Sequence, residues 1–284
     1  MDRVPIIFIE DLLNRIGALD ELHRHRNLSG FYGLWATTMN EDCPCRSLDI
    51  VDGRFNRFSD FNFGTLATAE ASEPNSKLRT LKYVSFDVPE PTESVPPIDP
   101  TLPAMLNRHF KGPGMLGLEL LSCLLDDKWV QLLSSWESLN LLTVCSDFTE
   151  ATFQLLENLL NQEQLIKLII DVDNYGTLEM DLFCEFLRQK QFLSLVFYST
   201  SEEMKVRIMA ETDKEKFAGS TITWMHSAVL HDESFQPLAR VGEDDVQFKK
   251  GNMLVTYWNQ SAGQGASEDE FIKGAGQTHL HFLS

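Results

Sequence analysis

The chain has 284 residues, of which 43% are hydrophobic, and its formal net charge at pH 7 is −18. This length allows one extended domain or two smaller ones, and the negative charge, without a basic stripe of interleaved aromatic residues, argues against a nucleic-acid partner. No apolar run reaches the roughly 18 residues that span a bilayer and no signal-peptide pattern opens the sequence. We therefore expect a soluble intracellular protein, in the cytoplasm or the nucleus, without a membrane partner.

Residues 1–40 are predicted to be helical. Val4-Pro5 opens a segment whose apolar side chains recur at three- and four-residue steps, and Gly17 ends it. The members of this stripe are Ile6, Ile9, Leu12, Leu13 and Ile16. A second apolar set with helical steps follows at Leu28, Phe31, Leu34 and Trp35.

Residues 47–88 are predicted to form strands. Asp52-Gly53 is a tight-turn signal, and residues 77–84 roughly alternate between polar and apolar side chains. The next segment, residues 89–104, is rich in proline, which lacks an amide hydrogen and fits poorly in a helix or a ladder, so a linker or a long surface excursion is expected there. Residues 105–284 are predicted to form one α/β domain, in which residues 115–134 are helical in composition.

Three stretches within this domain share one spacing of apolar residues, and a small polar residue follows each stretch at a fixed offset. They are Leu139, Leu142 and Val144 with Asp147; Leu165, Leu168 and Ile170 with Asp173; and Phe192, Leu195 and Phe197 with Thr200. The starts are separated by 26 and 27 residues, which is the size of a leucine-rich-repeat unit. Stacked units of this kind share a core and leave an outer surface free to bind a partner.

The helical segments repeat as well. Phe153, Leu156 and Leu160 are followed 27 residues later by Met180, Phe183 and Leu187, at steps that place side chains on one helical face. The alternative is an ordinary α/β domain whose strands and helices happen to fall at similar intervals.

A weaker fourth unit is predicted to follow. Ile222 and Trp224 lie 27 residues beyond Leu195 and Phe197. The matching helix positions offer little apolar surface, which is typical of a terminal cap. These positions are Arg207, Ala210 and Lys214.

The C-terminal part is predicted to contain a β-hairpin. Residues 244–248 and 253–258 are strand-like and flank the turn sequence Lys250-Gly251-Asn252. Residues 278–282 alternate again and predict a last strand with Leu280 and Phe282 facing the core.

Few motifs in this sequence indicate chemistry. Gly112-Pro113-Gly114-Met115-Leu116-Gly117 matches the dinucleotide fingerprint G-x-G-x-x-G, but no buried strand precedes it, so a helix-entry loop is favoured over cofactor binding. The group 231–234, His-Asp-Glu-Ser, gathers reactive residue types, but sequence neighbours do not face one another as a nucleophile and its base must. We therefore expect no catalytic residues and no cofactor.

Histidines and cysteines near the N-terminus could in principle hold zinc. His23 and His25 lie close in sequence to Cys43 and Cys45, but the spacing is not a zinc-finger pattern, and a basic loop with ordinary thiols is favoured over a metal site. The five cysteines are an odd number at irregular spacing, which favours a reducing compartment.

The N-terminal pattern resembles the degenerate start of an F-box. It consists of Val4-Pro5, Ile9, Leu12 and Ile16, followed by Leu28-Ser29, Phe31 and Leu34. With a tail like residues 255–262 and Asp269-Glu270-Phe271, the chain resembles the expanded nematode family of F-box-like proteins with a leucine-rich-repeat-like region. This resemblance implies an α/β fold in which F-box-like helices precede a stack of strand-helix units and a C-terminal hairpin.

The resemblance also implies a function. Pro5, Ile9, Leu12 and Ile16 would offer an apolar face to a Skp-type adaptor protein, and the repeats would hold a target protein. The chain would then be the substrate-recognition subunit of a cullin-RING ubiquitin ligase, which positions its target and breaks no bond. The alternative is a repeat-type interaction protein without ligase association, in which the same stripe packs onto the repeats as an N-terminal cap.

Overall fold

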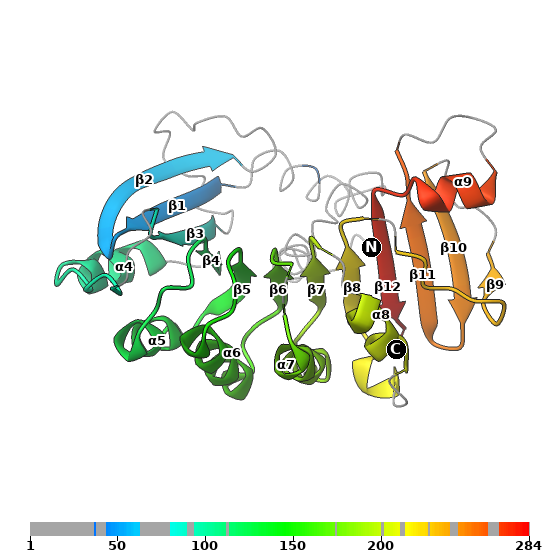
Figure 1. Ribbon diagram of the computed structural model, residues 1–284. Helices are drawn as coiled ribbons and strands as arrows, with labels where there is room; N and C mark the ends of the chain where they lie inside the picture. The colour runs from blue at the N-terminus through cyan, green and yellow to red at the C-terminus, as the bar shows by residue number, and fades with distance from the viewer. Residues whose placement is uncertain are drawn as a thin grey trace, which may run out of the picture. The chain divides into compact units, whose positions relative to one another are not determined.

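The computed structural model describes residues 37, 44–62, 80–89, 94–111, 114–173, 175–199, 202–210, 214–226, 228–238, 244–260 and 267–283. The chain divides into two compact units, Met1–Thr143 and Val144–Ser284. Both units are mixed α/β, with strands and helices in alternation over much of their length (Figure 1). Among the described residues, no helix is both long and apolar enough to cross a bilayer.

The first unit contains a sheet with strand order β2-β1-β3-β4-β5. Its strands are β1 (Pro44–Val51), β2 (Arg54–Asn62), β3 (Thr80–Asp87), β4 (Gly114–Leu120) and β5 (Leu139–Val144), the last of which leads into the second unit. β1 and β2 are antiparallel and joined at Asp52-Gly53, whose φ angles of 49° and 76° suit a tight hairpin turn. β1 pairs in parallel with β3, and β3 in parallel with β4. The predicted turn is therefore confirmed, and so are strands in the described part of the predicted region, residues 47–62 and 80–88.

Helices α4 (Leu102–Phe110) and α5 (Asp127–Ser134) cover one face of this sheet. The indole of Trp129 on α5 meets the ring of Phe86 edge to face, with centroids 4.8 Å apart. Lys82 Nζ donates a hydrogen bond to the carbonyl oxygen of Phe110 at the end of α4, at 3.0 Å. Because successive strand residues point to opposite faces, the side chains of β3 that alternate with Lys82 and Phe86 lie on the other face.

The described part of the proline-rich segment packs against the sheet and helix α5 of the first unit, to which it belongs. Trp129 Nε1 donates to the carbonyl oxygen of Pro96 at 2.8 Å, and the amide of Asp99 donates to the carbonyl of Gly53 at 3.0 Å. Leu102 is fully buried. The division of the chain into units falls after Thr143 and not within this segment.

The predicted helix over residues 115–134 is wrong in its first half. Gly114–Leu120 is strand β4, which pairs residue by residue with β3, and only Asp127–Ser134 is helical. The carboxylate of Asp126 caps this helix by accepting from the amides of Lys128 and Trp129. A short apolar run fits a buried strand or a buried helix equally well, and pairing with β3 decides the outcome here.

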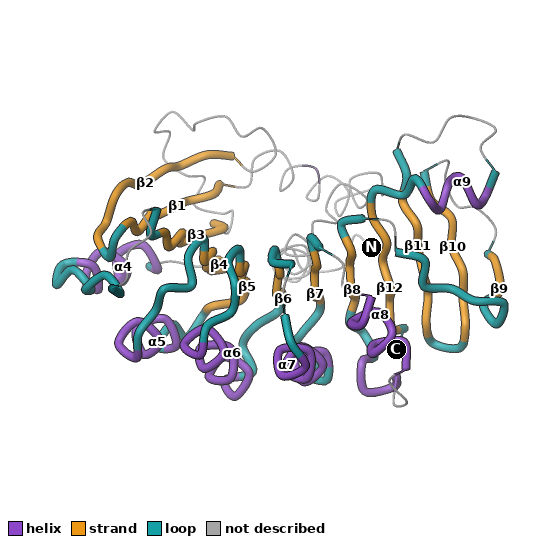
Figure 2. The backbone as a smooth tube through the Cα atoms, viewed as in Figure 1, coloured by secondary structure: helices purple, strands orange, loops and turns teal. Residues whose placement is uncertain are grey.

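The second unit contains a sheet with strand order β6-β7-β8-β12-β11-β10-β9. The strands are β6 (Lys167–Ile170), β7 (Ser194–Phe197), β8 (Thr221–Trp224), β9 (Gln236–Pro237), β10 (Asp245–Lys250), β11 (Met253–Trp258) and β12 (Gln277–Phe282). Its helices are α6 (Glu150–Gln162), α7 (Thr177–Leu187), α8 (Glu202–Ala210), α9 (Glu268–Lys273) and the short 3-10 helix η1 (Lys214–Phe217). Figure 2 shows α6 and α7 side by side, each followed by a return to the next strand.

The shared apolar spacing corresponds to a shared register. β6, β7 and β8 are parallel, and Leu168 pairs with Leu195, which pairs with Ile222. All three side chains are fully buried. Two residues further along, Ile170, Phe197 and Trp224 form a second buried row, in which the rings of Phe197 and Trp224 stack with centroids 6.2 Å apart.

The helical stripes differ between α6 and α7. In α7, the predicted core residues Met180, Phe183 and Leu187 are all buried. In α6, Leu156 is buried, but Phe153 and Leu160 are only partly covered. The buried face of α6 consists of Thr152, Leu155, Leu156 and Leu159. This set also has helical spacing, so α6 is rotated about its axis relative to the prediction.

The C-terminal predictions are confirmed. β10 and β11 form an antiparallel hairpin around Gly251, whose φ is +59°, and Leu280 and Phe282 on β12 are buried. Asn259, just after β11, donates from Nδ2 to the carbonyl of Phe271 in α9 at 2.9 Å. The described part of the tail that resembles the F-box-like family, residues 255–260 and 269–271, is thus packed together.

Candidate functional site

A row of polar side chains crosses the sheet of the first unit on the face away from α4 and α5. Arg57 on β2 pairs in register with Asp49 on β1, Asp49 with Ser85 on β3, and Ser85 with Glu119 on β4. Directly paired residues point to the same face of a sheet. Four strands therefore bring a guanidinium, a carboxylate, a hydroxyl and a second carboxylate into one line.

A second row, one pleat along, carries two serines, a tyrosine and a glycine. Ser59, Ser47, Tyr83 and Gly117 are in register on the same four strands. A Cβ on Gly117 would lie 2.7 Å from Cε1 of Tyr83, so the tyrosine ring lies directly over this glycine. We call these two rows together the polar face; apart from the exposed Arg57 and the buried Gly117, its side chains are half-buried.

The charges on the polar face are unevenly compensated. Arg57 Nε lies 2.6 Å from Asp49 Oδ2, and Ser47 Oγ donates to Asp49 Oδ1 at 3.1 Å, so Asp49 is both ion-paired and hydrogen-bonded. Ser85 donates to the carboxylate of Glu119, but no cation of the described residues pairs with it. Partial burial, followed by repulsion from Asp49, raises the pKa of Glu119 above its usual range, and the Ser85 hydrogen bond only partly offsets this.

The Glu119 carboxylate is therefore expected to destabilise the folded protein at neutral pH. A raised carboxyl pKa contributes stability that is present below the ordinary value of about 4.3 and is lost as the pH rises through the folded value. Glu119→Gln should raise the free energy of unfolding at pH 7 by about 0.2–1 kcal/mol, the size typical of partly exposed charges.

This gain should shrink as the pH falls toward 4.5. Urea denaturation at several pH values measures it, with Glu157→Gln on the exposed surface of α6 as the matched control. A Glu119→Gln variant less stable than wild type at pH 7 would contradict the account of Glu119.

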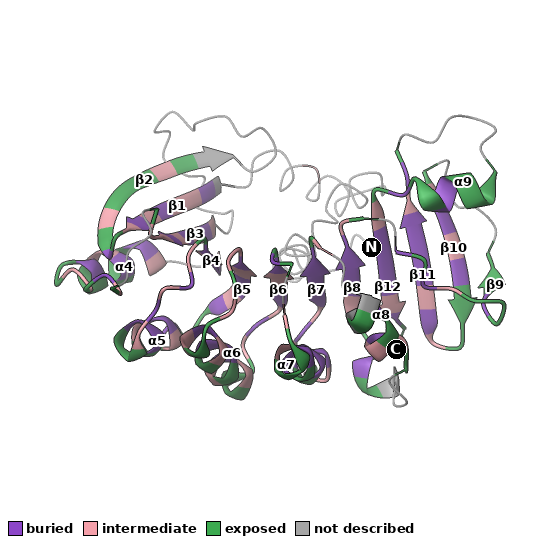
Figure 3. Cartoon of the chain, viewed as in Figure 1, coloured by how far each residue is buried: buried purple, intermediate pink, exposed green. Residues whose placement is uncertain are grey.

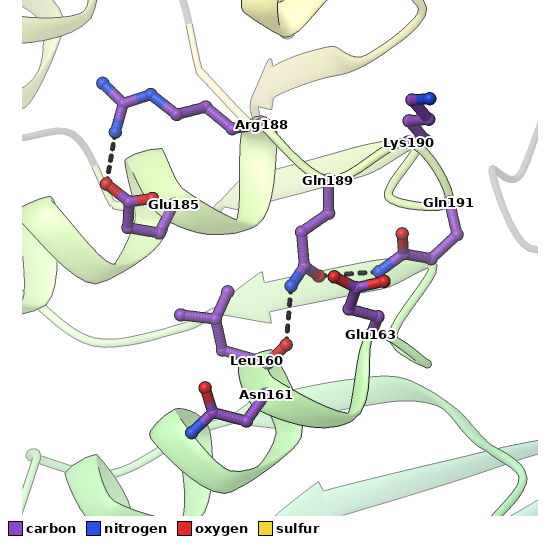
Figure 4. A pocket seen from close by; sticks show the side chains of 8 residues that line it. All are labelled: Leu160, Asn161, Glu163, Glu185, Arg188, Gln189, Lys190 and Gln191. Atoms are coloured by element: carbon purple, nitrogen blue, oxygen red, sulfur yellow. Dashed lines mark hydrogen bonds and ion pairs between the residues drawn. The ribbon is translucent and has the colours of Figure 1, made fainter.

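A pocket of about 560 Å³ lies where α6 and α7 end. Figure 4 shows its lining, in which Gln189 Nε2 donates to the carbonyl of Leu160 at 2.6 Å and Gln191 Nε2 donates to Gln189 Oε1 at 2.7 Å. Arg188 pairs with Glu185 in the same view. The lining residues are Leu160, Asn161, Glu163, Glu185, Arg188, Gln189, Lys190 and Gln191. Its two acids, Glu163 and Glu185, and its two bases, Arg188 and Lys190, give the lining no net charge.

The helix-free face of the second unit also carries polar residues. Thr223 on β8 pairs in register with His279 on β12, which pairs with Thr256 on β11. Thr223 Oγ1 lies 3.0 Å from His279 Nδ1, and the rings of His279 and His281 stack with centroids 5.8 Å apart.

The centre of this face is not exposed. Lys167 and Ser194 are each only 4% exposed, and Thr223, His279 and Thr256 are buried as well. Figure 3 shows strands β7 and β11 mostly in purple, the colour of buried residues. The surface that the sequence predicts to be free for a partner is therefore covered at its centre. The half-buried polar face of the first unit is the more accessible of the two.

The N-terminal predictions lie outside the described residues. This holds for the adaptor-binding residues Pro5, Ile9, Leu12 and Ile16, and for His23, His25 and Cys43. Cys45 is described and is fully buried in β1. Within the described ranges, no three His, Cys, Asp or Glu side chains gather in a way that would hold a metal ion.

The remaining motif residues are dispersed. Gly114 of the glycine motif begins strand β4, so a strand follows where the helix was expected. Asp147 and Asp173, which follow the repeat strands, are exposed. His231 and Asp232 lie in the loop after β8, where His231 is held by Tyr257.

No spacing motif identifies the polar face in the sequence. Asp49, Ser85 and Glu119 are far apart along the chain and meet only through strand register. The sequence contains one signal that could have pointed to this site, because Glu119 is a charged residue inside the apolar run 115–120. No protein-family model, no curated protein and no solved structure matches this chain.

Proposed function

We propose that this chain is a protein-recognition subunit, without enzymatic activity, whose target binds the polar face of the first unit. The observation that supports this proposal is the half-buried Glu119 carboxylate, which lacks a cation among the described residues and is repelled by the Asp49 carboxylate on the other side of Ser85. A charged group that weakens the free fold is typical of a site selected for binding. A basic side chain from a partner would relieve the repulsion between the two carboxylates.

The repeated strand-helix spacing supports a repeat-type recognition architecture. Leu168, Leu195 and Ile222 occupy equivalent positions of adjacent parallel strands, as stacked leucine-rich-repeat-like units require. Repeat proteins of this kind present the strand surface that the helices leave uncovered. The polar face of the first unit is also a strand surface that the helices leave uncovered, although its strands, β1 to β4, lie outside these repeats.

The second half of the proposal is association with a ubiquitin ligase. In this proposal, Pro5, Ile9, Leu12 and Ile16 form an apolar face for a Skp-type adaptor of a cullin-RING ligase, and the support is the F-box resemblance of the N-terminal pattern. The alternative is a repeat-type interaction module without ligase association, in which this stripe caps the repeats.

A charge reversal tests the target-binding surface. Glu119→Lys should reduce co-purification of the target at least tenfold, because it places a like charge opposite the partner's basic group. Glu157→Lys, at an exposed position of α6, makes the same charge change elsewhere and should leave co-purification unchanged. Quantitative mass spectrometry of the proteins bound to each variant measures the amount of target recovered. Equal recovery of the target with both variants would exclude the polar face as its binding surface.

A separate experiment tests the adaptor. The chain co-expressed with a recombinant Skp-type adaptor should co-purify with it, and Ile9→Asp or Leu12→Asp should abolish the complex while leaving the circular dichroism spectrum native. Unfolding of these variants would instead favour the alternative in which the N-terminal stripe packs onto the repeats as a cap, since a buried unpaired charge costs several kcal/mol. No complex with the wild-type chain would rule out the ligase role and leave target binding unaffected.

A further inference from the structure

A loop of the second unit is fastened to the C-terminal hairpin at one hydroxyl group. Residues 228–238 pass from β8 to β9 beside strands β11 and β10, as the teal loop in Figure 2 shows. The amides of Leu230 and His231 both donate to Tyr257 Oη, at 3.0 and 3.4 Å, and His231 Nδ1 lies 2.7 Å from the same oxygen. Tyr257, on β11, is fully buried.

This arrangement determines where the protons lie. A phenolic oxygen has two acceptor lone pairs and one hydrogen to donate. The two amides occupy both lone pairs, so the hydroxyl hydrogen must point to His231 Nδ1, which therefore carries no proton. The neutral imidazole with its hydrogen on Nε2 is the form that the bonded network requires.

A second proton on His231 conflicts with this network. It would place a hydrogen on Nδ1 facing an oxygen whose lone pairs are already taken. Tyr257 would then have to release one amide to accept from the imidazolium, and its own hydrogen would lose its partner inside the protein. A buried polar group without a partner destabilises the structure around it.

The surroundings of His231 nevertheless allow protonation. Its ring lies parallel to that of Phe248 on β10, with centroids 3.9 Å apart and planes at 12°, and an aromatic face also accepts a cationic ring. Burial lowers the pKa of His231 below its usual range, and the carboxylates of Glu268, Asp232 and Asp269 act in the opposite direction. Among the described residues, the contacts give one cation on this side of His231. It is Lys250 on β10, whose Nζ lies 4.0 Å from Asp232 Oδ2.

We propose that His231 and Tyr257 form a proton-sensitive clasp that holds residues 228–238 on the β10–β11 hairpin and loosens when His231 becomes protonated. The loop contributes β9, which pairs with Phe248 and Lys249 of β10. Loosening therefore also weakens the pairing at the outer edge of β10. The clasp acts within the second unit and is independent of the proposed function.

Amide hydrogen exchange of the whole chain, followed by NMR, tests the clasp. Between pH 7.5 and pH 5.0, the protection of the Leu230 amide, corrected for intrinsic exchange, should fall about tenfold. Its midpoint should coincide with the titration of the His231 imidazole. The Asn259 amide, which donates to the carbonyl of Asp244, should not change. Unchanged Leu230 protection, or an imidazole that stays neutral throughout this range, would overturn the proposal.

Two variants separate the clasp from a general effect of acid. His231→Phe keeps an aromatic ring against Phe248 but cannot bind a proton, so its Leu230 protection should not change between pH 7.5 and pH 5.0. His226→Gln alters an exposed histidine in the same connection and should retain the wild-type response. A pH response that persists in His231→Phe would show that another group is responsible.

Discussion

Replacing Leu195 by alanine is expected to lower the free energy of unfolding of the second unit by about 2–5 kcal/mol. Leu195 is fully buried at the centre of the parallel strands, paired with Leu168 on one side and Ile222 on the other. The loss combines the transfer free energy of the removed methyl groups with the cavity that a packed sheet cannot close.

The matched control is Leu178→Ala. Leu178 lies in the first turn of α7 and is 67% exposed, so the same chemical change should shift the free energy of unfolding by less than about 0.5 kcal/mol. Urea denaturation followed by far-UV circular dichroism compares the two variants. Similar effects for both would contradict the stacked core described for β6, β7 and β8.

Gly53→Ala is expected to destabilise the first unit by about 2–5 kcal/mol. Its φ of +76° already costs an L-residue about 1–2 kcal/mol. In addition, the new Cβ would lie 2.3 Å from the carbonyl oxygen of Pro97, and moving that backbone adds about 1–3 kcal/mol. The segment cannot move freely, because the amide of Asp99 is bonded to the Gly53 carbonyl.

Gly251→Ala provides the comparison. Gly251 occupies the turn of the β10–β11 hairpin with a φ of +59°, and a Cβ there would meet no atom within 4 Å. The free energy of unfolding of this variant should fall only by the cost of a positive φ at an L-residue, about 1–2 kcal/mol. Equal destabilisation by the two substitutions, measured by denaturant unfolding, would show that the contact with Pro97 contributes nothing.

Pattern-based prediction succeeded where one side of an element is buried in a regular way. The Asp52-Gly53 turn, the β10–β11 hairpin and the last strand follow from turn residues and alternation, and the structure contains all three. It failed over residues 115–134, because the run Met-Leu-Gly-Leu-Glu-Leu suits a buried strand as well as a helix. It also placed two of the three stripe residues of α6 wrongly, because Phe153 and Leu160 are only partly covered while Leu156 is buried as predicted. Leucines at neighbouring positions offer two overlapping stripes.

The candidate site was harder to predict than the fold. Its residues belong to four strands, and only their register makes Arg57, Asp49, Ser85 and Glu119 neighbours. The bond between His231 and Tyr257 likewise joins residues from a loop and a strand. Single-sequence patterns report which face of an element is apolar, and they carry no information on which strands pair.

The sequence by itself determined the recurring apolar positions of β6, β7 and β8, since side-chain burial follows directly from the spacing of Leu168, Leu195 and Ile222. Only the tertiary structure decided which polar groups meet. Strand register placed Glu119 in one row with Ser85 and Asp49, and the path of the loop after β8 brought His231 within hydrogen-bond distance of Tyr257. Such contacts depend on distances between segments that local propensity does not set.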